Sequence, residues 1–369
     1  MPKRGENIRK RKDGRYEARI IDFYKENGKP HYKSIYSKSY TDVKEMKKEY
    51  YIQEKGIEKE INVNKKIAEV CEEWLIRSKT KIKQSTYATY HRTIENHIIP
   101  YFENMGLKNI ENKEVQKFIE YKDNMGLSVK TIRDIAVLLL QIIKYAEKEK
   151  YILNFDYDLC LPKLPEQEFK ILTAIEENRL NHYLKNNLTL ENFCVILAKE
   201  TGIRIGELCA LQLQDIDLEN GTVKINKTIQ RIKNLDPNGG AKTKIIITTP
   251  KSKKSVRVIP LPDSITAMAK RLYKNDSPDS YILTGTPKYM EPRLFQKKFK
   301  KLLEKLNIKD ITVHSLRHGF ASKAVEQNFD AKSLSEILGH ASVRFTLDRY
   351  VHSSFELKRT HMNKMASGF

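Results

Sequence analysis

The spacing of apolar residues changes along the chain, and this change most constrains the fold. Residues 61–155 carry apolar side chains at the i, i+3, i+4 spacing of a buried helix face. In IAEVCEEWLIRS these positions are Ile67, Val70, Cys71, Trp74 and Leu75. The segments on either side instead contain runs typical of strands. A chain of 369 residues with both periods is predicted to form several domains.

Residues 1–60 are predicted to form a small α+β domain. RYEARIIDFY and HYKSIYSKSY are typical of strands, and the turn ENGKP between them contains Asn27-Gly28. This dipeptide between two strand-like segments is a strong hairpin signal. The following TDVKEMKKEYYIQEKG predicts a helix with Thr41 or Asp42 as its N-cap.

Residues 61–160 are predicted to form an all-α domain. Its helices are expected to begin at Ser85 or Thr86 and at Ser128, residue types that cap helix N-termini. Residues 161–169, LPKLPEQEF, contain two prolines and little periodicity, which indicates a linker. Thr173 is expected to cap the first helix beyond it.

Residues 170–369 are predicted to be mainly helical with a small three-stranded antiparallel sheet. A helix, a turn at Thr201-Gly202 and a second helix come first. Three strands are then expected in TVKINKTIQRI, KIIITT and SVRVIPLP. From Ser264 onward the pattern is again mostly helical.

The charge balance indicates a polyanionic partner. Lys and Arg exceed Asp and Glu by 21, and cationic surfaces release condensed counterions when they meet phosphates. Nucleic acid is therefore favoured over the alternative, a generally adhesive or ribosome-bound basic protein. The four cysteines form no CxxC pair, and three of them, Cys71, Cys194 and Cys209, are expected to be buried thiols. We expect a cytoplasmic protein, without a membrane partner, that joins the nucleoid when bound to DNA.

Two basic clusters are candidate DNA contacts. One lies in the N-terminal domain, and the other, interleaved with an aromatic residue, lies near a helix start in the all-α domain. Solvated surface is the alternative for both. The residues are Arg9, Lys10, Arg11 and Lys12 in the first cluster, and Lys81, Lys83, Tyr87 and Arg92 in the second.

Four separate segments of residues 170–369 hold polar residues suited to phosphoryl transfer. These are Arg204 in TGIRIGEL, Lys251 in TPKSKKSVRVIPL, His314 and Arg317 in HSLRHGFAS, and His340 and Tyr350 in LGHASVRFTLDRYVH. Two arginines can grip one phosphate and oppose the charge that develops at phosphorus. A tyrosine phenol can accept the phosphoryl group, and a lysine can protonate the leaving oxygen.

Taken singly, each of these residues is more often structural. His314 and His318 at i, i+4 could suggest a zinc helix, but Arg317 lies beside them and no HExxH pattern is present. No metal and no cofactor are therefore expected. The combination and order of the residues carry the inference.

The order Arg, Lys, HxxR, His, Tyr in these contexts resembles the tyrosine recombinase (phage integrase) family. The domain order resembles integrases of temperate phages and conjugative transposons. The resemblance implies that Arg204 and Arg317 clamp the scissile phosphate and that His314 acts as general base. It also implies that Lys251 protonates the leaving 5′-hydroxyl, although Lys253 and Lys254 share its turn. His340 would bind the phosphate, and Tyr350 would form a 3′-phosphotyrosyl bond.

The resemblance further implies an arm-type DNA-binding domain at 1–60, a core-binding SAM-like domain at 61–160 and a catalytic domain at 170–369. The expected partners are double-stranded DNA with core and arm attachment sites, a homotetramer on that DNA, and an accessory excision or DNA-bending protein. Glu207 resembles a buried acid that orients the first arginine. Two alternatives remain: a type IB topoisomerase and a catalytically silent DNA-binding protein.

Overall fold

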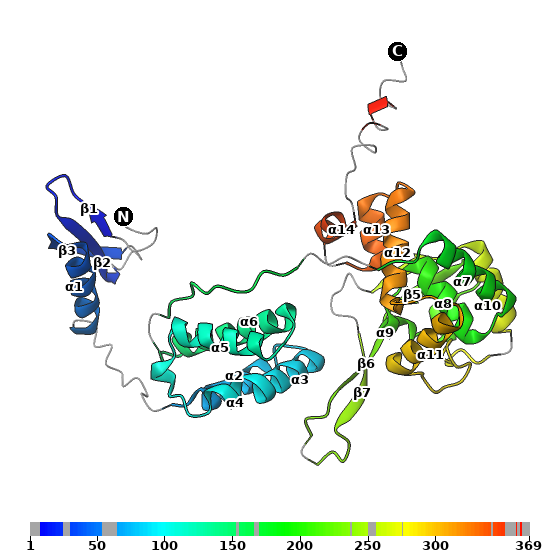
Figure 1. The fold of residues 1–369 in the computed structure, drawn as a ribbon, viewed down its shortest axis with the longest axis horizontal. Helices are drawn as coiled ribbons and strands as arrows, with labels where there is room; N and C mark the ends of the chain where they lie inside the picture. The colour runs from blue at the N-terminus through cyan, green and yellow to red at the C-terminus, as the bar shows by residue number, and fades with distance from the viewer. Residues whose placement is uncertain are drawn as a thin grey trace. The chain divides into compact units, whose positions relative to one another are not determined.

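The structure is a computed structural model of the chain (Figure 1). It describes residues 8–24, 30–53, 65–152, 155–165, 170–236, 238–249, 256–274, 276–340, 342–350, 359 and 362–363. Within these ranges, the side chains of 21–24, 48, 51–53 and 348–350 are not described. The chain divides into two compact units, Met1–Leu164 and Pro165–Phe369, which are treated separately below.

The first unit begins with a three-stranded antiparallel sheet of order β1-β2-β3. The strands are β1 (Ile8–Lys10), β2 (Tyr16–Tyr24) and β3 (Pro30–Ser37). Tyr24 pairs with Pro30, which confirms the predicted hairpin; Asn27-Gly28 itself lies outside the described residues. Strand β1 was not expected, because its basic residues were interpreted only as a DNA-binding arm or a solvated tail.

Helix α1 (Tyr40–Gln53) packs on this sheet through a small core of Ile8, Ala18 and Val43. The helix begins directly after Ser39, whose hydroxyl accepts a hydrogen bond from the Asp42 amide at 3.4 Å. The predicted N-caps, Thr41 and Asp42, were therefore wrong by two to three residues, because Ser39 offers the same hydroxyl one residue before the helix starts.

The rest of the first unit is mainly helical, as predicted, although residues 155–164 form no helix. It contains α2 (Ile67–Ser78), α3 (Gln84–Thr93), a π-helical turn (Ile94–Ile98), α4 (Ile99–Phe102), a 3-10 turn (Leu107–Asn109), α5 (Asn112–Asn124) and α6 (Val129–Lys148). Ser128 caps α6 by accepting from the Thr131 amide, as predicted. Helix α3 instead follows Lys83 without a side-chain cap, so the prediction of Ser85 or Thr86 was wrong.

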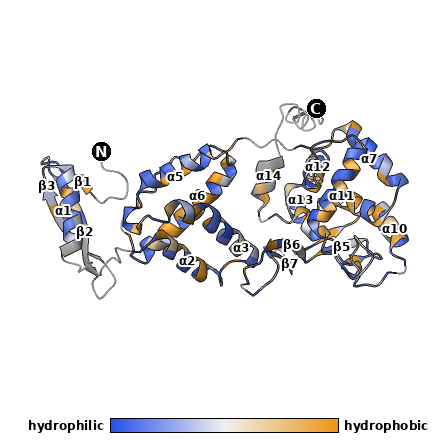
Figure 2. Ribbon diagram, turned by 60° about the horizontal axis from the view of Figure 1, so that its bottom comes forward, coloured by the Kyte–Doolittle hydropathy of each residue, from blue (hydrophilic) through white to orange (hydrophobic). Residues whose placement is uncertain are grey.

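The helices of this region share one apolar core. Side chains from α2, α5 and α6 meet in it, and Figure 2 shows hydrophobic and hydrophilic residues side by side on these helices. The largest fully buried side chains include Phe102, Phe118 and Leu139. None of these core residues belongs to the small core beneath the N-terminal sheet.

The second unit begins with α7 (Ala174–Asn186), capped by Thr173 as predicted, followed by α8 (Leu190–Thr201) and α9 (Ile205–Leu208). Gly202 ends α8 in the left-handed conformation, with φ +62°. A Cβ there would lie 2.7 Å from Phe320 Cδ1, so both the backbone conformation and the space require glycine. This turn connects α8 to Arg204, which lies directly before α9.

The strands of the second unit pair differently from the prediction. TVKINKTIQRI divides at Asn226-Lys227 into β5 (Thr222–Ile225) and β6 (Thr228–Lys233). Strand β5 lies between β4 (Ile216–Asp217) and β8 (Arg257–Pro260) in a three-stranded sheet, whereas β6 pairs with β7 (Thr243–Thr248) in a separate ribbon. The local alternation of apolar and polar residues predicted the strands, but it did not predict which strands pair with each other.

The remaining helices confirm the predicted helical C-terminal part. They are α10 (Asp263–Leu272), α11 (Pro292–Lys305), α12 (Val313–Glu326), α13 (Ala331–Leu338) and α14 (Val343–Tyr350). Helix α12 packs on α8, and α13 contacts α12, α14 and β8. Cys71, Cys194 and Cys209 are buried, as predicted. In the described part of the chain, no helix combines the length and apolar character needed to cross a membrane.

Close packing of α9 on β6 predicts opposite effects for two glycine substitutions. A Cβ on Gly206 would lie 2.7 Å from Thr228 Oγ1 and 2.8 Å from the Ile229 carbonyl oxygen, whereas one on Gly319 in α12 would meet nothing within 4 Å. We expect Gly206→Ala to lower the free energy of unfolding by about 1–3 kcal/mol. Gly319→Ala should raise it by about 0.5–1 kcal/mol. Chemical denaturation of both variants tests this; equal effects would contradict the packing argument.

Candidate active site

The C-terminal end of α13 brings three arginines from distant segments together. Arg257 Nε donates to the Ile337 carbonyl (2.5 Å), Arg317 Nη2 to the Leu338 carbonyl (2.8 Å) and Arg204 Nη2 to the Gly339 carbonyl (3.1 Å). The last carbonyls of a helix have no partner within the helix and carry the negative end of its dipole. Three successive carbonyls therefore orient three guanidinium groups.

Glu207 joins two of these arginines. Arg204 Nη1 donates to Glu207 Oε1 and Arg257 Nη2 donates to Glu207 Oε2, both at 2.9 Å. The Glu207 side chain is 3% exposed. Burial acts to raise its pKa, but the hydrogen bond and charge of Arg257, with the charge of Arg204, outweigh burial and lower the pKa below its usual value. Glu207 thus orients Arg204 as an ionised carboxylate, in agreement with the role expected from the sequence.

The two arginines predicted to act together differ in exposure. Arg204, at the start of α9, keeps 37% of its side chain exposed. Arg317, inside α12, is 2% exposed, and its Nη1 also donates to the Gly202 carbonyl at 2.7 Å. The turn at Gly202 therefore positions both, through the chain for Arg204 and through a hydrogen bond for Arg317.

His314 lies on α12 and His340 lies just beyond α13, the two helices that adjoin this cluster of arginines. His314 is exposed near the start of α12, and its ring meets the buried ring of His318 edge to face, with centroids 4.6 Å apart. His340 lies two residues beyond the last residue of α13 and is 7% exposed. Its Nδ1 is 2.8 Å from the hydroxyl of the fully buried Thr346, so a phosphate would have to be reached through Nε2.

The last two predicted residues, Tyr350 and Lys251, lie partly or wholly outside the described part of the chain. Tyr350 is the final residue of α14, but its side chain lies outside the described part of the chain. Lys251 lies outside the described residues altogether, as do Lys253 and Lys254, in the segment between β7 and β8. Strand β8, which follows that segment, delivers Arg257 to the cluster of arginines.

Two residues of this site were missed from the sequence, Arg257 and Thr346. Arg257 follows a lysine-rich turn, in a segment from which only a strand was predicted. Strand periodicity could have found it, because Arg257 and Ile259 are both buried on one face of β8 whereas Val258 between them is 58% exposed. An arginine at a core position of a strand requires buried partners. No comparable sequence signal distinguishes Thr346.

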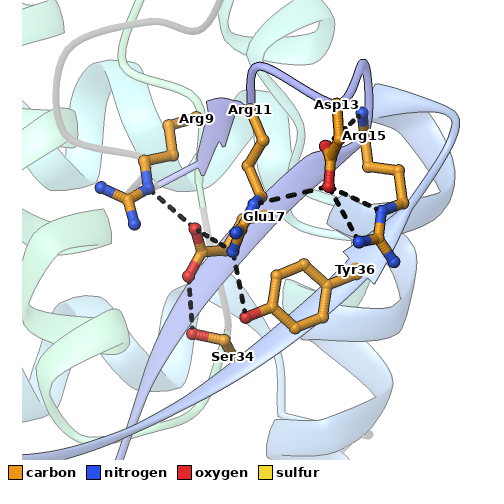
Figure 3. Close-up of polar contacts among 7 residues, drawn as sticks. All are labelled: Arg9, Arg11, Asp13, Arg15, Glu17, Ser34 and Tyr36. Atoms are coloured by element: carbon orange, nitrogen blue, oxygen red, sulfur yellow. Dashed lines mark hydrogen bonds and ion pairs between the residues drawn. The ribbon is translucent and has the colours of Figure 1, made fainter.

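A second polar cluster occupies one face of the N-terminal sheet (Figure 3). Glu17, 3% exposed, accepts hydrogen bonds from Arg9 Nε and Ser34 Oγ, both at 2.8 Å, and pairs with Arg11 at 3.6 Å. The hydrogen bonds from Arg9 and Ser34 lower the pKa of Glu17. The guanidinium carbon of Arg11 lies 5.3 Å from the ring centroid of Tyr36. Glu17 and Tyr36 thus hold the arginines in place on an exposed sheet surface.

The other predicted DNA contacts lie at the surface of the first unit. Lys10 and Lys12 are exposed, and the Lys10 ammonium lies 5.7 Å from the Tyr16 ring centroid. Lys81 and Arg92 are exposed, Lys83 is half-buried at the N-cap of α3, and Tyr87 packs against the helical core. Lys81 and Lys83 therefore lie at the N-terminal end of α3, where the helix dipole also favours anions.

Comparison with known families matches both units. The profile of the phage integrase family covers residues 170–356, and that of the phage integrase N-terminal SAM-like domain covers residues 66–122. The chain belongs to the phage integrase family. It is therefore an enzyme of the tyrosine recombinase class, which confirms the resemblance drawn from the four motifs.

Known relatives agree with this assignment. The chain is 28% identical over 360 residues to a protein named tyrosine recombinase XerC-like from Caldanaerobacter subterraneus subsp. tengcongensis, covering 89% of each chain. The fold is similar to that of the Tn1549 transposon integrase in complex with transposon right end DNA (TM-score 0.68, 21% identity, 82% of this chain and 100% of that chain). It is also similar to a lambda integrase tetramer bound to a Holliday junction (TM-score 0.56, 17% identity, 91% and 96%). These likenesses confirm the predicted fold class.

The buried pairing of Glu207 predicts a pH-dependent stability. Because its folded-state pKa lies below the usual value of 4.5, Glu207 stabilises the fold above about pH 4.5, and this contribution is lost as the pH falls through the folded-state pKa. Glu207→Gln should lower the free energy of unfolding by about 3 kcal/mol at pH 7. The difference from wild type should shrink on acidification.

Glu291→Gln is the matched control, since Glu291 pairs with Arg231 on the surface at 3.0 Å. That variant should lower the free energy of unfolding by less than about 1 kcal/mol. Denaturation curves from pH 3 to 8 measure both. A loss for Glu207→Gln that stays constant over this range would contradict the ionised pairing.

Proposed function

We propose that this enzyme integrates and excises a mobile DNA element by cutting and rejoining strands at its attachment sites. The observation that carries the proposal is the convergence of Arg204 and Arg317 on one helix end, directly before His340 and the helix that ends at Tyr350. Two fixed cations beside a histidine and a tyrosine-bearing helix suit phosphoryl transfer. The transposon integrase of similar fold, bound to transposon end DNA, supports the choice of substrate.

In the proposed first step, Tyr350 Oη attacks the scissile phosphorus. A bond forms between phosphorus and the phenol oxygen, and the bond from phosphorus to the 5′-oxygen breaks. His314 takes the phenol proton, and Lys251 gives a proton to the leaving 5′-oxygen. Arg204 and Arg317 oppose the charge on the non-bridging oxygens, while His340 donates a hydrogen bond to one of them through Nε2.

In the second step, the 5′-hydroxyl of a partner strand attacks the 3′-phosphotyrosyl bond and releases Tyr350. The number of phosphodiester bonds is unchanged, so the covalent link conserves their energy and no cofactor is consumed. Exchange of both strands requires four cleavages, two before and two after a Holliday junction. We propose four protomers on two duplexes, supported by the lambda integrase tetramer on such a junction.

DNA binding is assigned to the parts of the chain as follows. Residues 1–60 would bind arm sites through the arginine face of the sheet, the face that carries Arg9 and Arg11. Residues 61–160 would bind the core site around the N-terminus of α3. Residues 161–169 would link the latter to the catalytic domain, 170–369. Separate apolar cores for the sheet and the helices support the first boundary, and the SAM-like match at 66–122 supports the second assignment. An accessory excision or DNA-bending protein is a further proposed partner.

Tyr350→Phe tests the reaction. The substrate is labelled duplex DNA spanning the ends of the element that encodes this chain, nicked near the crossover so that cleavage traps the enzyme. Wild type should give an SDS-resistant protein–DNA band, and Tyr350→Phe should give none, because it lacks the phenol oxygen. The mobility shift with intact DNA should be equal for both proteins.

Three other results would contradict the proposal. A covalent band from both proteins would mean that another residue is the nucleophile. Relaxation of supercoiled plasmid without any attachment site would instead favour a topoisomerase. A mobility shift without a band from either protein, even with host extract added to supply accessory factors, would favour a catalytically silent DNA-binding protein.

The arginine face of the sheet predicts a change in salt dependence. If Arg11 contacts a phosphate, Arg11→Gln should reduce the slope of log affinity against log salt by about 1 for arm-site DNA. Arg179→Gln is the control, because it removes the same charge from an exposed arginine of α7 in the other unit. Binding isotherms at several salt concentrations measure both slopes. Equal slopes for wild type and Arg11→Gln would show that Arg11 does not contact a phosphate.

A further inference from the structure

Arg257 is a buried arginine to which the reaction proposed above gives no part. It opens β8, is 8% exposed, and bonds both the Ile337 carbonyl and Glu207. Its guanidinium also lies against Gly339, where a Cβ would be 3.0 Å from Nη1 and 3.2 Å from Cζ. The left-handed Gly339 is thus placed directly against this side chain, and His340 is the next residue.

Burying a guanidinium is costly, and an apolar residue of similar volume often serves stability equally well. The contacts of Arg257 suggest a different benefit. Its partners are the two groups that also determine the position of Arg204: the Glu207 carboxylate and the end of α13. Arg257 and Arg204 therefore share one carboxylate and bind neighbouring carbonyls of one helix end.

We propose that Arg257 is a positioning residue for the cleavage step, acting on Arg204 through Glu207 and the end of α13. This inference rests on the proposed recombinase reaction. Without Arg257, Glu207 would keep its carboxylate oxygens for Arg204 alone, and the Ile337 carbonyl would lose its donor. Arg204 could then turn towards the carboxylate, away from a phosphate. A guanidinium displaced by about 1 Å is enough to slow catalysis about 100-fold.

The first test measures covalent complex formation on the nicked duplex with the full chain. Arg257→Met should cleave about 100-fold more slowly than wild type while binding the duplex with unchanged affinity, because the side chain is buried within the protein. Arg179→Met is the matched control: Arg179 Nη1 donates to the Leu306 carbonyl after α11, another helix end, at 2.7 Å. It should cleave at the wild-type rate.

A second comparison separates positioning from general loss of structure. If Arg257 acts through Glu207, the two substitutions should not add: Arg257→Met should slow the Glu207→Gln variant by less than about 5-fold. Equal losses in both backgrounds would overturn the proposal. If Arg257→Met does not fold, Arg257→Lys replaces it. The lysine keeps the charge but lacks the planar fork that reaches two acceptors, and a slowing of about 10-fold is expected.

A neutral substrate gives the readout that a purely structural role would not change. A methylphosphonate at the cleavage position lacks the negative charge that Arg204 opposes, so displacement of Arg204 should matter less there. The deficit of Arg257→Met relative to wild type should fall from about 100-fold on phosphate to below about 10-fold on methylphosphonate. The same deficit on the phosphate and the methylphosphonate substrates would show that Arg257 has only a structural role.

The two proposals fail in different ways. Absence of a covalent complex from wild type would refute the proposed function itself. Wild-type cleavage together with an unimpaired Arg257→Met variant would refute only the positioning role of Arg257.

Discussion

The unpaired carbonyls at the end of α13 organise the second unit. A helix end leaves acceptors that must find donors, and here each of three successive carbonyls takes a guanidinium from a different segment. These segments are the turn after α8, strand β8 and helix α12. The same short stretch of backbone leads into His340 and then into α14. The tertiary fold and the geometry of the candidate site therefore depend on the same hydrogen bonds.

This arrangement also explains why Glu207 is buried. Guanidinium groups close together repel one another, and in a buried environment that repulsion is weakly screened. One carboxylate between Arg204 and Arg257 offsets it and holds both side chains together with the carbonyls. Gly202 and Gly339 complete the arrangement, since both end helices in the left-handed conformation at points where a side chain would clash.

The sequence predicted the elements of this site better than their connections. The i, i+3 spacing correctly placed His314 and Arg317 on one helix, but exposure differs between them because α12 turns Arg317 towards the Gly202 and Leu338 carbonyls. Those carbonyls come from remote segments and leave no local signal. Strand β8 was predicted, but its pairing with β5 was not, because that pairing depends on tertiary contacts. Arg257, the first residue of β8, was also not predicted as part of the site. The predictions of helix caps were wrong in two places. Helix α1 begins after an earlier serine, Ser39, and α3 begins without a side-chain cap.

The choice of carbonyls over carboxylates as partners has an electrostatic consequence. Carbonyl dipoles orient a guanidinium without cancelling its charge, whereas each carboxylate cancels one. Among the four side chains Arg204, Arg257, Arg317 and Glu207, three positive charges meet one negative charge at the end of α13. A phosphodiester carries one negative charge, and its five-coordinate state approaches two. In the proposed reaction, positive charge that is oriented by carbonyls would oppose the added negative charge of the five-coordinate state more than the charge of the bound substrate, which is the condition for accelerating the reaction.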